Sequence, residues 1–277
     1  MLARTTSSQV TASVEATAFL EAAATTFRSP ACDSDATLSF GIDLGTATIV
    51  LTAVDRQGRP AYWDSLPCQA VRDGVVVNFG DAVAAVKQLK ATATAALDRE
   101  IAAAATAFPP GVPPAEARAC RYVLENAGIT CRQLVDEVTA AQALLQLTEG
   151  AIVDVGGGST GVGVVMNGTI IALDDEPGGG HHLDLILAGA LGISIEEAEE
   201  RKRRGDHDYS HILRPGIERI ASSIVRQIGE HPVQSIHLAG GAVRVPHAAS
   251  IVTAFSGIKA WAYPHSELVT PFGIAMS

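Results

Sequence analysis

The sequence has few basic residues for its length. Its 277 residues include 20 Lys and Arg against 30 Asp and Glu, which gives a formal net charge of −10. Proteins that bind nucleic acid concentrate Lys and Arg on one face. The densest basic run, Arg201–Arg204, follows four glutamates, as expected for the solvated end of a helix. We therefore expect no nucleic-acid partner.

Cysteine and long apolar runs are also scarce. The chain has four cysteines, none of them in a Cys-x-x-Cys pair, and we expect no secretory leader before them. No apolar run reaches the roughly 20 residues that a membrane-spanning helix needs. These absences predict reduced thiols, a cytoplasmic location and no membrane partner.

Apolar residues make up 47% of the chain, and one apolar stretch has an unusual ending. The stretch 151–165 runs into Asp154, then into Gly156–Gly158, and continues as a second β-branched run. This pattern predicts a β-hairpin whose tip carries no side chains. Backbone N–H groups and the Ser159 hydroxyl at such a tip can reach phosphate oxygens, and Asp154 can hold the water shell of Mg²⁺. An ordinary glycine-rich turn has the same pattern.

A near copy of this device lies upstream, in residues 38–54. An apolar strand again ends in an acid, Asp43, and is followed by Gly45, Thr46 and a second strand that continues to Val54. Two such hairpins that face each other across a cleft would grip a nucleotide tail and its metal from both sides. The chain is long enough to place one hairpin in each of two α/β domains.

Two other segments place chemistry at the ends of strands. Residues 135–143 run from a short strand into a helix, which puts Glu137 at a strand exit, where ligands bind in open α/β folds. Residues 235–246 form a strand that ends in Gly240 and Gly241, followed by Arg244. The two glycines would let a flat ring lie against the backbone with the guanidinium stacked on it. A left-handed turn with a surface arginine is the alternative.

Residues 1–36 look like an extension. A helix is predicted from Ser8 to Phe27, ended by Pro30. Small and apolar residues recur along one face of it, namely Ala12, Ala16, Phe19, Leu20, Ala23 and Phe27. Such a stripe either packs on the body or docks a partner. We expect the second, a helix that recruits a partner and does not complete the core.

The remaining pattern is that of an alternating α/β chain. It predicts helices at 81–101, 115–127, 181–190, 195–203 and 212–228, strands at 101–107 and 169–174, and a last helix at 270–275 that returns to the first domain.

Four motifs, taken in order, resemble the actin-like and DnaK-type chaperone ATPase superfamily. They are Asp-Leu-Gly-Thr at 43–46, Asp-Glu-Val-Thr-Ala-Ala at 136–141, Asp-Val-Gly-Gly-Gly-Ser-Thr at 154–160 and Ala-Gly-Gly-Ala-Val-Arg-Val-Pro at 239–246. The segment Val71–Val76 and the helix after it also resemble the bacterial cell-shape actins and pilus-assembly proteins. The amino-terminal helix and the total length look most like the ethanolamine-utilisation member of the superfamily.

The resemblance implies two ribonuclease-H-like domains that flank a cleft for ATP and Mg²⁺. We expect an extension at 1–36, a first domain at 37–148 completed by 268–277, and a second domain at 149–267.

The superfamily's site residues carry over by motif. Asp43 and Asp154 match the acids that hold magnesium through water, and Glu137 matches the residue that orients the attacking water. The phosphate loops are matched by Gly45, Thr46, Gly156, Gly157, Gly158 and Ser159. The contacts to ribose and adenine are matched by Glu199 and Lys202, and those of the adenine-side loop by Gly240, Gly241 and Arg244.

The sequence departs from the chaperone pattern at several points. Val138 stands where the chaperones usually have proline, and Gly161 stands where an acid often follows the second phosphate loop. No lysine matches their phosphate-contacting lysine, since Lys87 and Lys90 lie on the wrong kind of element. We also expect neither the large insertion that covers the cleft nor a peptide-binding domain, and hydrolysis that is slow or absent.

Three functions remain open after this comparison. The first is a slow ATPase that acts by lobe closure, in the manner of a chaperone, on a protein client of ethanolamine utilisation, in the cytoplasm and in association with a bacterial microcompartment. The second is a scaffold that responds to the nucleotide without turnover. The third is a small-molecule kinase of the same superfamily, for which the sequence offers no separate catalytic base.

Overall fold

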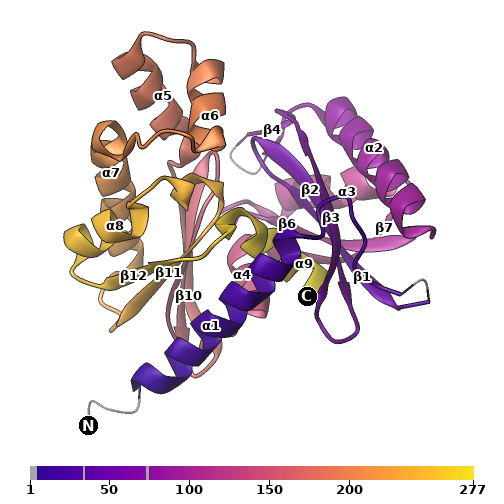
Figure 1. Ribbon diagram of the computed structural model, residues 1–277, viewed down its shortest axis with the longest axis horizontal. Coiled ribbons are helices and arrows are strands. Elements are labelled where there is room, and N and C mark those ends of the chain that lie inside the picture. Colours follow the sequence, from indigo (N-terminus) through magenta and orange to yellow (C-terminus); the bar gives the residue numbers. More distant parts are fainter. Residues whose placement is uncertain (1–4, 34, 73–74) are drawn as a thin grey trace.

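The computed structural model describes residues 5–33, 35–72 and 75–277. Within these residues the chain forms two five-stranded sheets that stand side by side (Figure 1). The first sheet has the order β3 (Pro60–Pro67), β2 (Thr48–Asp55), β1 (Leu38–Leu44), β6 (Ala103–Phe108) and β7 (Thr130–Asp136). The second has the order β10 (Thr169–Pro177), β9 (Ser159–Met166), β8 (Glu149–Val155), β11 (Ser235–Ala239) and β12 (Lys259–Ala262).

The two sheets share one topology. In each, three strands form an antiparallel meander, and the first of these strands pairs in parallel with a fourth, which pairs in parallel with a fifth. This is the ribonuclease-H-like arrangement that the resemblance to the superfamily implies. Each central strand, β1 and β8, therefore ends in one of the two hairpin tips.

Helices cover both sheets. Those of the first are α2 (Phe79–Leu97) and α3 (Pro114–Asn126), and those of the second are α7 (Ser210–Ile228) and α8 (Ala248–Ser256). Helix α5 (Gly180–Leu191) packs on α7, and α6 (Ile195–Arg204) packs on α5. We call the first sheet with α2 and α3 the first lobe, and the second sheet with α5 to α8 the second lobe. Short elements complete the chain: β4 (Val71–Arg72), β5 (Val75–Val76), η1 (Gly241–Arg244) and η2 (Ser266–Leu268). The predicted motif at 71–76 includes Asp73 and Gly74, which lie outside the described residues.

The predicted helix at 81–101 is too long at its carboxyl end. Helix α2 ends at Leu97, because Asp98 adopts a left-handed conformation with φ 50° and its N–H donates to the carbonyl of Thr94. That bond satisfies a terminal carbonyl and turns the chain out of the helix. The strand predicted after it is present as β6.

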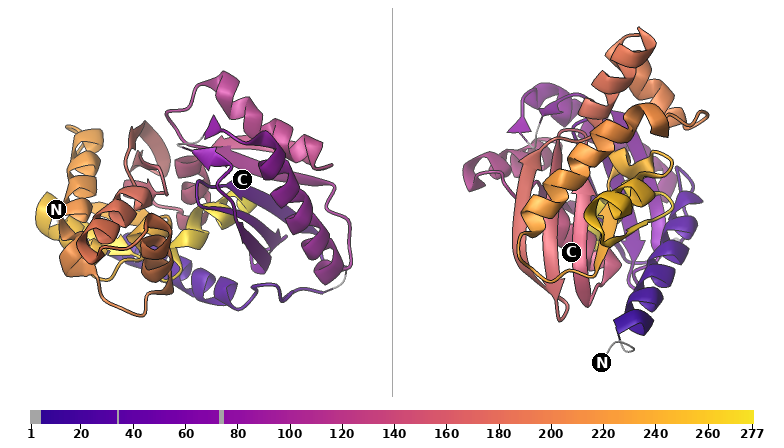
Figure 2. Two further views of the ribbon diagram at one scale, coloured as in Figure 1. Left: turned by 90° about the horizontal axis from the view of Figure 1, so that it is seen from above. Right: turned by 90° about the vertical axis from the view of Figure 1, so that its left-hand side faces the viewer.

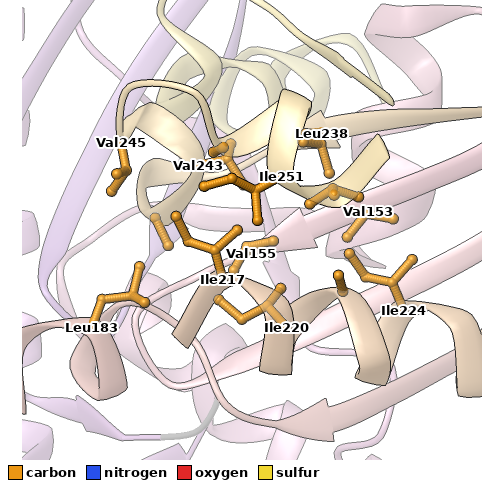
Figure 3. Close-up of a cluster of buried hydrophobic side chains, with 14 of the residues drawn as sticks. Val153, Val155, Leu183, Ile217, Ile220, Ile224, Leu238, Val243, Val245 and Ile251 are labelled. Atoms are coloured by element: carbon orange, nitrogen blue, oxygen red, sulfur yellow. The ribbon is translucent and has the colours of Figure 1, made fainter. Parts of the chain in front are cut away.

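The second lobe has an aliphatic core between its sheet and α7. Figure 3 shows Ile217, Ile220 and Ile224 of α7 pointing toward Val153 and Leu238 of the sheet. The 3- and 4-residue spacing of these isoleucines keeps them on one helical face. The alternating residues of β8 supply the facing surface, so the strand that carries Asp154 is fixed by its neighbours in the chain.

Two helices join the lobes at close range, namely α4 (Glu137–Leu145) and α9 (Val269–Met276). A Cβ on Gly273 of α9 would lie 1.9 Å from the carbonyl oxygen of Ala140 in α4. A Cβ on Gly41 of β1 would lie 2.6 Å from the backbone nitrogen of Ala275. Only glycine allows these approaches. The last helix therefore packs directly on the first sheet, as seen from above in Figure 2.

Helix α1 (Thr5–Ala24) packs across the junction of the two lobes (Figure 1). Ala16, Leu20 and Ala23 are buried in one cluster with Val54 of the first lobe and Leu268, which follows the second. The ring of Phe19 meets that of Phe272 edge to face, with centroids 5.3 Å apart.

The chain after α1 is also fastened to the first lobe. The indole N–H of Trp63 donates to the carbonyl of Ala23, and Arg28 pairs with the buried carboxylate of Asp64 at 2.6 Å. The expectation that this face recruits a partner and leaves the core complete without it is therefore wrong for residues 16–23, because the apolar stripe is consumed by packing. The side chain of Ala12 lies outside the described residues.

We expect Leu20→Ala to lower the free energy of unfolding by about 2–5 kcal/mol, because Leu20 is fully buried and its truncation leaves a cavity. Val14→Ala is the matched control: this residue of the same helix is 61% exposed, so its loss should change stability by only about 0.5 kcal/mol. Urea unfolding followed by circular dichroism measures both. Equal, small effects would mean that α1 does not pack on the body.

Candidate functional site

The tips of the two glycine hairpins meet. A Cβ on Gly157, in the β8–β9 tip, would lie 3.1 Å from the Cβ of Thr46 and 3.8 Å from the backbone nitrogen of Ala47, both in the β1–β2 tip. The structure thus brings Gly45 and Thr46 together with Gly156–Gly158, which are more than a hundred residues away in the sequence. The glycines keep the contact free of side chains from the second tip.

The second tip is held in place by the entry to α5. The carbonyls of Gly156, Gly157 and Gly158 accept hydrogen bonds from the N–H groups of Gly180, His181 and Gly178, at 2.9, 2.8 and 2.7 Å. In a trans peptide the N–H points opposite to the C=O. The N–H groups that follow these carbonyls therefore point away from α5, and together they can receive an anion such as a phosphate.

Three acids stand behind the tips. Asp43 is the next-to-last residue of β1, Asp154 has the same position in β8, and Glu137 is the first residue of α4. Burial and then the charge of Asp154 raise the pKa of Asp43 to about 7. Burial raises the pKa of Asp154 to about 6, and a hydrogen bond from Thr270 acts against that rise. Burial and then the charges of Asp154 and Asp43 raise the pKa of Glu137 well above its usual value. The three carboxyl groups therefore share one poorly hydrated volume.

Such a cluster fits a divalent cation that keeps its water shell. Among the described residues no group of three or more His, Cys, Asp or Glu side chains is arranged to ligate one metal ion directly. Magnesium commonly retains several waters and is held by one or two carboxylates plus phosphate oxygens. Asp43 and Asp154, together with the two tips, match that donor set, because they offer separate carboxylates next to a surface for phosphate.

Thr270 belongs to this site, and the sequence analysis missed it. Its hydroxyl donates to Oδ2 of Asp154 over 2.5 Å, from helix α9, 116 residues away in the sequence. Gly240 is also placed against this acid: its φ is +90°, and a Cβ there would lie 2.5 Å from Oδ1 of Asp154. The β11 exit therefore needs glycine for a local reason, whatever it binds. Residues 270 and 154 come together only in the folded chain.

The residues matched to ribose and adenine have protein partners in the structure. The Lys202 ammonium lies 2.7 Å from Oδ1 of Asp184 and donates to the carbonyl of Gly180 over 2.8 Å, with both side chains largely buried. Glu199 pairs with Arg203 at 3.6 Å. Since Gly180 donates to Gly156, Lys202 is one residue removed from the second tip.

The adenine-side loop adjoins this region, since a Cβ on Gly180 would lie 3.5 Å from the Cβ of Ala242. Gly241 begins η1, and Arg244, at its end, pairs with Oε1 of Glu267 at 3.3 Å while its side chain stays half-exposed. A Cβ on Gly241 would face the Cβ of Glu267 at 3.9 Å. The loop and η2 therefore form one surface, with Arg244 held along it.

The two departures from the chaperone pattern touch each other. A Cβ on Gly161 would lie 3.2 Å from Cγ2 of Val138, and a Cβ on Gly163 would lie 2.4 Å from Cγ1 of the same side chain. Val138 is fully buried between α4 and β9. The valine therefore requires glycine on the facing strand. Of the lysines considered earlier, Lys90 pairs with Glu100 at 2.7 Å and donates to the carbonyl of Gly128.

The sequence and the fold were compared with those of known proteins. A family model described as "Type IV pilus assembly protein PilM" matches residues 121–272. The ethanolamine utilization protein EutJ of Escherichia coli (strain K12) is 37% identical over 259 residues, which are 93% of this chain and 92% of the relative. The chain belongs to the EutJ family.

Solved structures agree with this assignment. The crystal structure of EutJ from Carboxydothermus hydrogenoformans superposes on this EutJ-family chain with a TM-score of 0.89 at 34% identity, over 95% of this chain and 99% of the other. MreB 5 of Spiroplasma citri bound to AMPPNP has a TM-score of 0.69 at 15% identity, over 85% and 94%. The PilM–PilN type IV pilus biogenesis complex gives 0.69 at 13%, over 88% and 98%. The predicted actin-like ATPase fold and the resemblance to the ethanolamine-utilisation member are confirmed.

We expect Asp43→Asn to stabilise the ligand-free protein at pH 8 and to have a smaller effect at pH 5. The Asp43 carboxyl has a pKa of about 7 when folded and near 3.8 when unfolded, so the folded state binds the extra proton between these values. Its contribution to stability is complete below about pH 4 and is lost as the pH rises through about 7. The asparagine has no charge to bury at pH 8.

The readout is Tm in EDTA at the two pH values. A gain of about 2–4 °C at pH 8 corresponds to about 1 kcal/mol in a protein of this size. Asp98→Asn, an exposed change at the end of α2, should leave the pH dependence as it is. An Asp43→Asn protein that is equally destabilised at both pH values would contradict the buried charge.

Proposed function

We propose that this EutJ-family protein binds ATP with Mg²⁺ between the two hairpin tips, hydrolyses it slowly, and uses the nucleotide to close its lobes on a partner protein of ethanolamine utilisation, in the manner of a chaperone. The observation that carries the proposal is the meeting of Gly157 and Thr46 in front of Asp43 and Asp154. A glycine tip with free-facing N–H groups, a second tip that meets it and two nearby carboxylates suit a triphosphate with its metal.

Each group in the site has a role under this proposal. Asp43 and Asp154 would hold magnesium through water, and the two tips would bind the phosphates. Lys202, Glu199 and the η1 loop would contact the nucleoside. Magnesium, when bound, neutralises charge on the phosphate oxygens. Glu137, at the start of α4, would accept a hydrogen bond from the attacking water.

One observation favours a second candidate, a nucleotide-responsive scaffold without turnover. Burial and the neighbouring acids hold the pKa of Glu137 well above its usual range. A raised pKa lowers the share of Glu137 carboxyl groups that are ionised and able to accept the water's proton. Turnover would then depend on how far bound magnesium lowers that pKa.

The partner is proposed from the family and the fold. The EutJ relatives are named for ethanolamine utilization, and the PilM–PilN structure is a complex of a protein of this fold with another protein. We place the protein in the cytoplasm, in association with the microcompartment of the pathway. No described helix is long and apolar enough to cross a membrane.

Mg-ATP should raise Tm, because a ligand that binds only the folded state stabilises it by about 2.7 kcal/mol at about 100-fold above its Kd. Differential scanning fluorimetry with ATP, ADP, GTP and AMP, each with and without magnesium, measures this. Asp154→Asn should lose the magnesium-dependent part of the shift. No shift at millimolar Mg-ATP would refute the nucleotide site.

Glu137→Gln separates binding from chemistry. The amide keeps the size of the side chain but cannot take a proton, so phosphate release should fall by roughly 10²-fold while the Mg-ATP shift in Tm persists. A malachite-green assay and the thermal assay on one preparation give both values. Full turnover in the variant would exclude Glu137 as the water-orienting group, and a wild type without turnover would favour the scaffold.

A further inference from the structure

A fourth carboxylate, that of Asp175, lies beside the strand that follows the second phosphate loop. Asp175 of β10 is the cross-strand partner of Gly161 in β9. A Cβ on Gly161 would lie 3.5 Å from Oδ1 of Asp175. The side chain of Asp175 therefore lies against the bare backbone that directly follows the tip residues Ser159 and Thr160. Residue 161 has no side chain of its own, and Val138, Pro110 and Asp175 share the space where its Cβ would lie.

The alternation of β10 fixes the direction of this side chain. The next residue, Glu176, is anchored to α7 by Ser223 and Arg226, both at 2.5 Å from its Oε2. Successive residues of a strand point to opposite faces. Asp175 must therefore face away from α7, toward α4 and the first lobe. Its placement follows from the sheet and not from a flexible side chain.

On that face Asp175 meets both the acid cluster and the first lobe. Its charge is one of the causes that raise the pKa of Glu137, after burial and the charges of Asp154 and Asp43. A Cβ on Gly111, in the loop after β6, would lie 3.3 Å from the Cβ of Asp175 and 3.6 Å from its Oδ2. The carboxylate thus lies where the two lobes and the exit of β7 come together.

We propose that Asp175 is a positioning residue of the nucleotide site that supplies, from β10, the carboxylate that position 161 lacks, and holds magnesium-bound water beside Glu137. This inference rests on the proposed function, because it assumes that Mg-ATP occupies the cleft. Asp175 would then hold a magnesium-bound water from β10, the edge strand of the second sheet. The departure at Gly161 is then a relocation of the acid by one strand and not its loss.

Two asparagine variants test this in the full chain. Asp175→Asn removes the charge and keeps the shape, and Asp174→Asn changes the exposed neighbour on the same strand. At fixed ATP, magnesium is titrated and the concentration that gives half of the rise in Tm is recorded. We expect Asp175→Asn to need about tenfold more magnesium, the lower range for losing an outer-shell partner. Asp174→Asn should stay within about twofold of wild type.

A second arm, ATP in EDTA, separates a role toward magnesium from simple repulsion. Without metal, losing a negative charge beside the triphosphate should leave the response to ATP unchanged or larger. A weaker response to ATP in EDTA would indicate a structural defect and overturn the proposal, as would equal magnesium requirements for Asp175→Asn and wild type. A wild type that does not respond to Mg-ATP at all would overturn the nucleotide site, and this inference with it.

Discussion

Loss of hydration at three neighbouring carboxyl groups is the constraint around which the rest of the structure is arranged. Asp43, Asp154 and Glu137 come from three different elements. Burial raises the pKa of each, and the charge of Asp154 adds to the rise at Asp43 and Glu137. A fold selected for stability alone would separate these groups or pair each with a cation. Here the acids are concentrated where the two tips meet, which costs stability in the ligand-free state, and under the proposed function a bound cation would remove that cost. Such a trade is typical of binding sites.

Close backbone contacts hold this arrangement in position. Gly41 and Gly273 let α9 lie against β1 and α4, and Gly240 lets the β11 exit lie against Asp154. Each contact leaves no room for a Cβ, so the positions of the acids are set by backbone and not by flexible side chains. The hydroxyl of Thr270 on α9 then links the junction of the lobes to Asp154. A shift of α9 would therefore be felt at the acid cluster.

Local pattern was enough to predict the hairpins, the strand exit at Glu137 and the returning helix, because each depends on residues close in sequence. It was not enough where long-range packing or one dihedral angle decides. The end of α2 depends on the left-handed Asp98. The stripe of α1 has the same periodicity whether it faces a partner or the body. Thr270 and Asp175 join the site through contacts and strand register that span up to 116 residues, which no single-sequence period encodes.

The packing of α9 also has a consequence for biosynthesis. The hydroxyl of Thr52, in β2, donates to the carbonyl of Pro271, 219 residues later, and Gly41 has its closest neighbours in the same helix. The first sheet therefore lacks part of its cover until α9 has been made. Contacts between such distant residues form slowly. During translation this sheet waits with an apolar surface exposed, which makes the nascent chain, more than the finished protein, the species most open to aggregation.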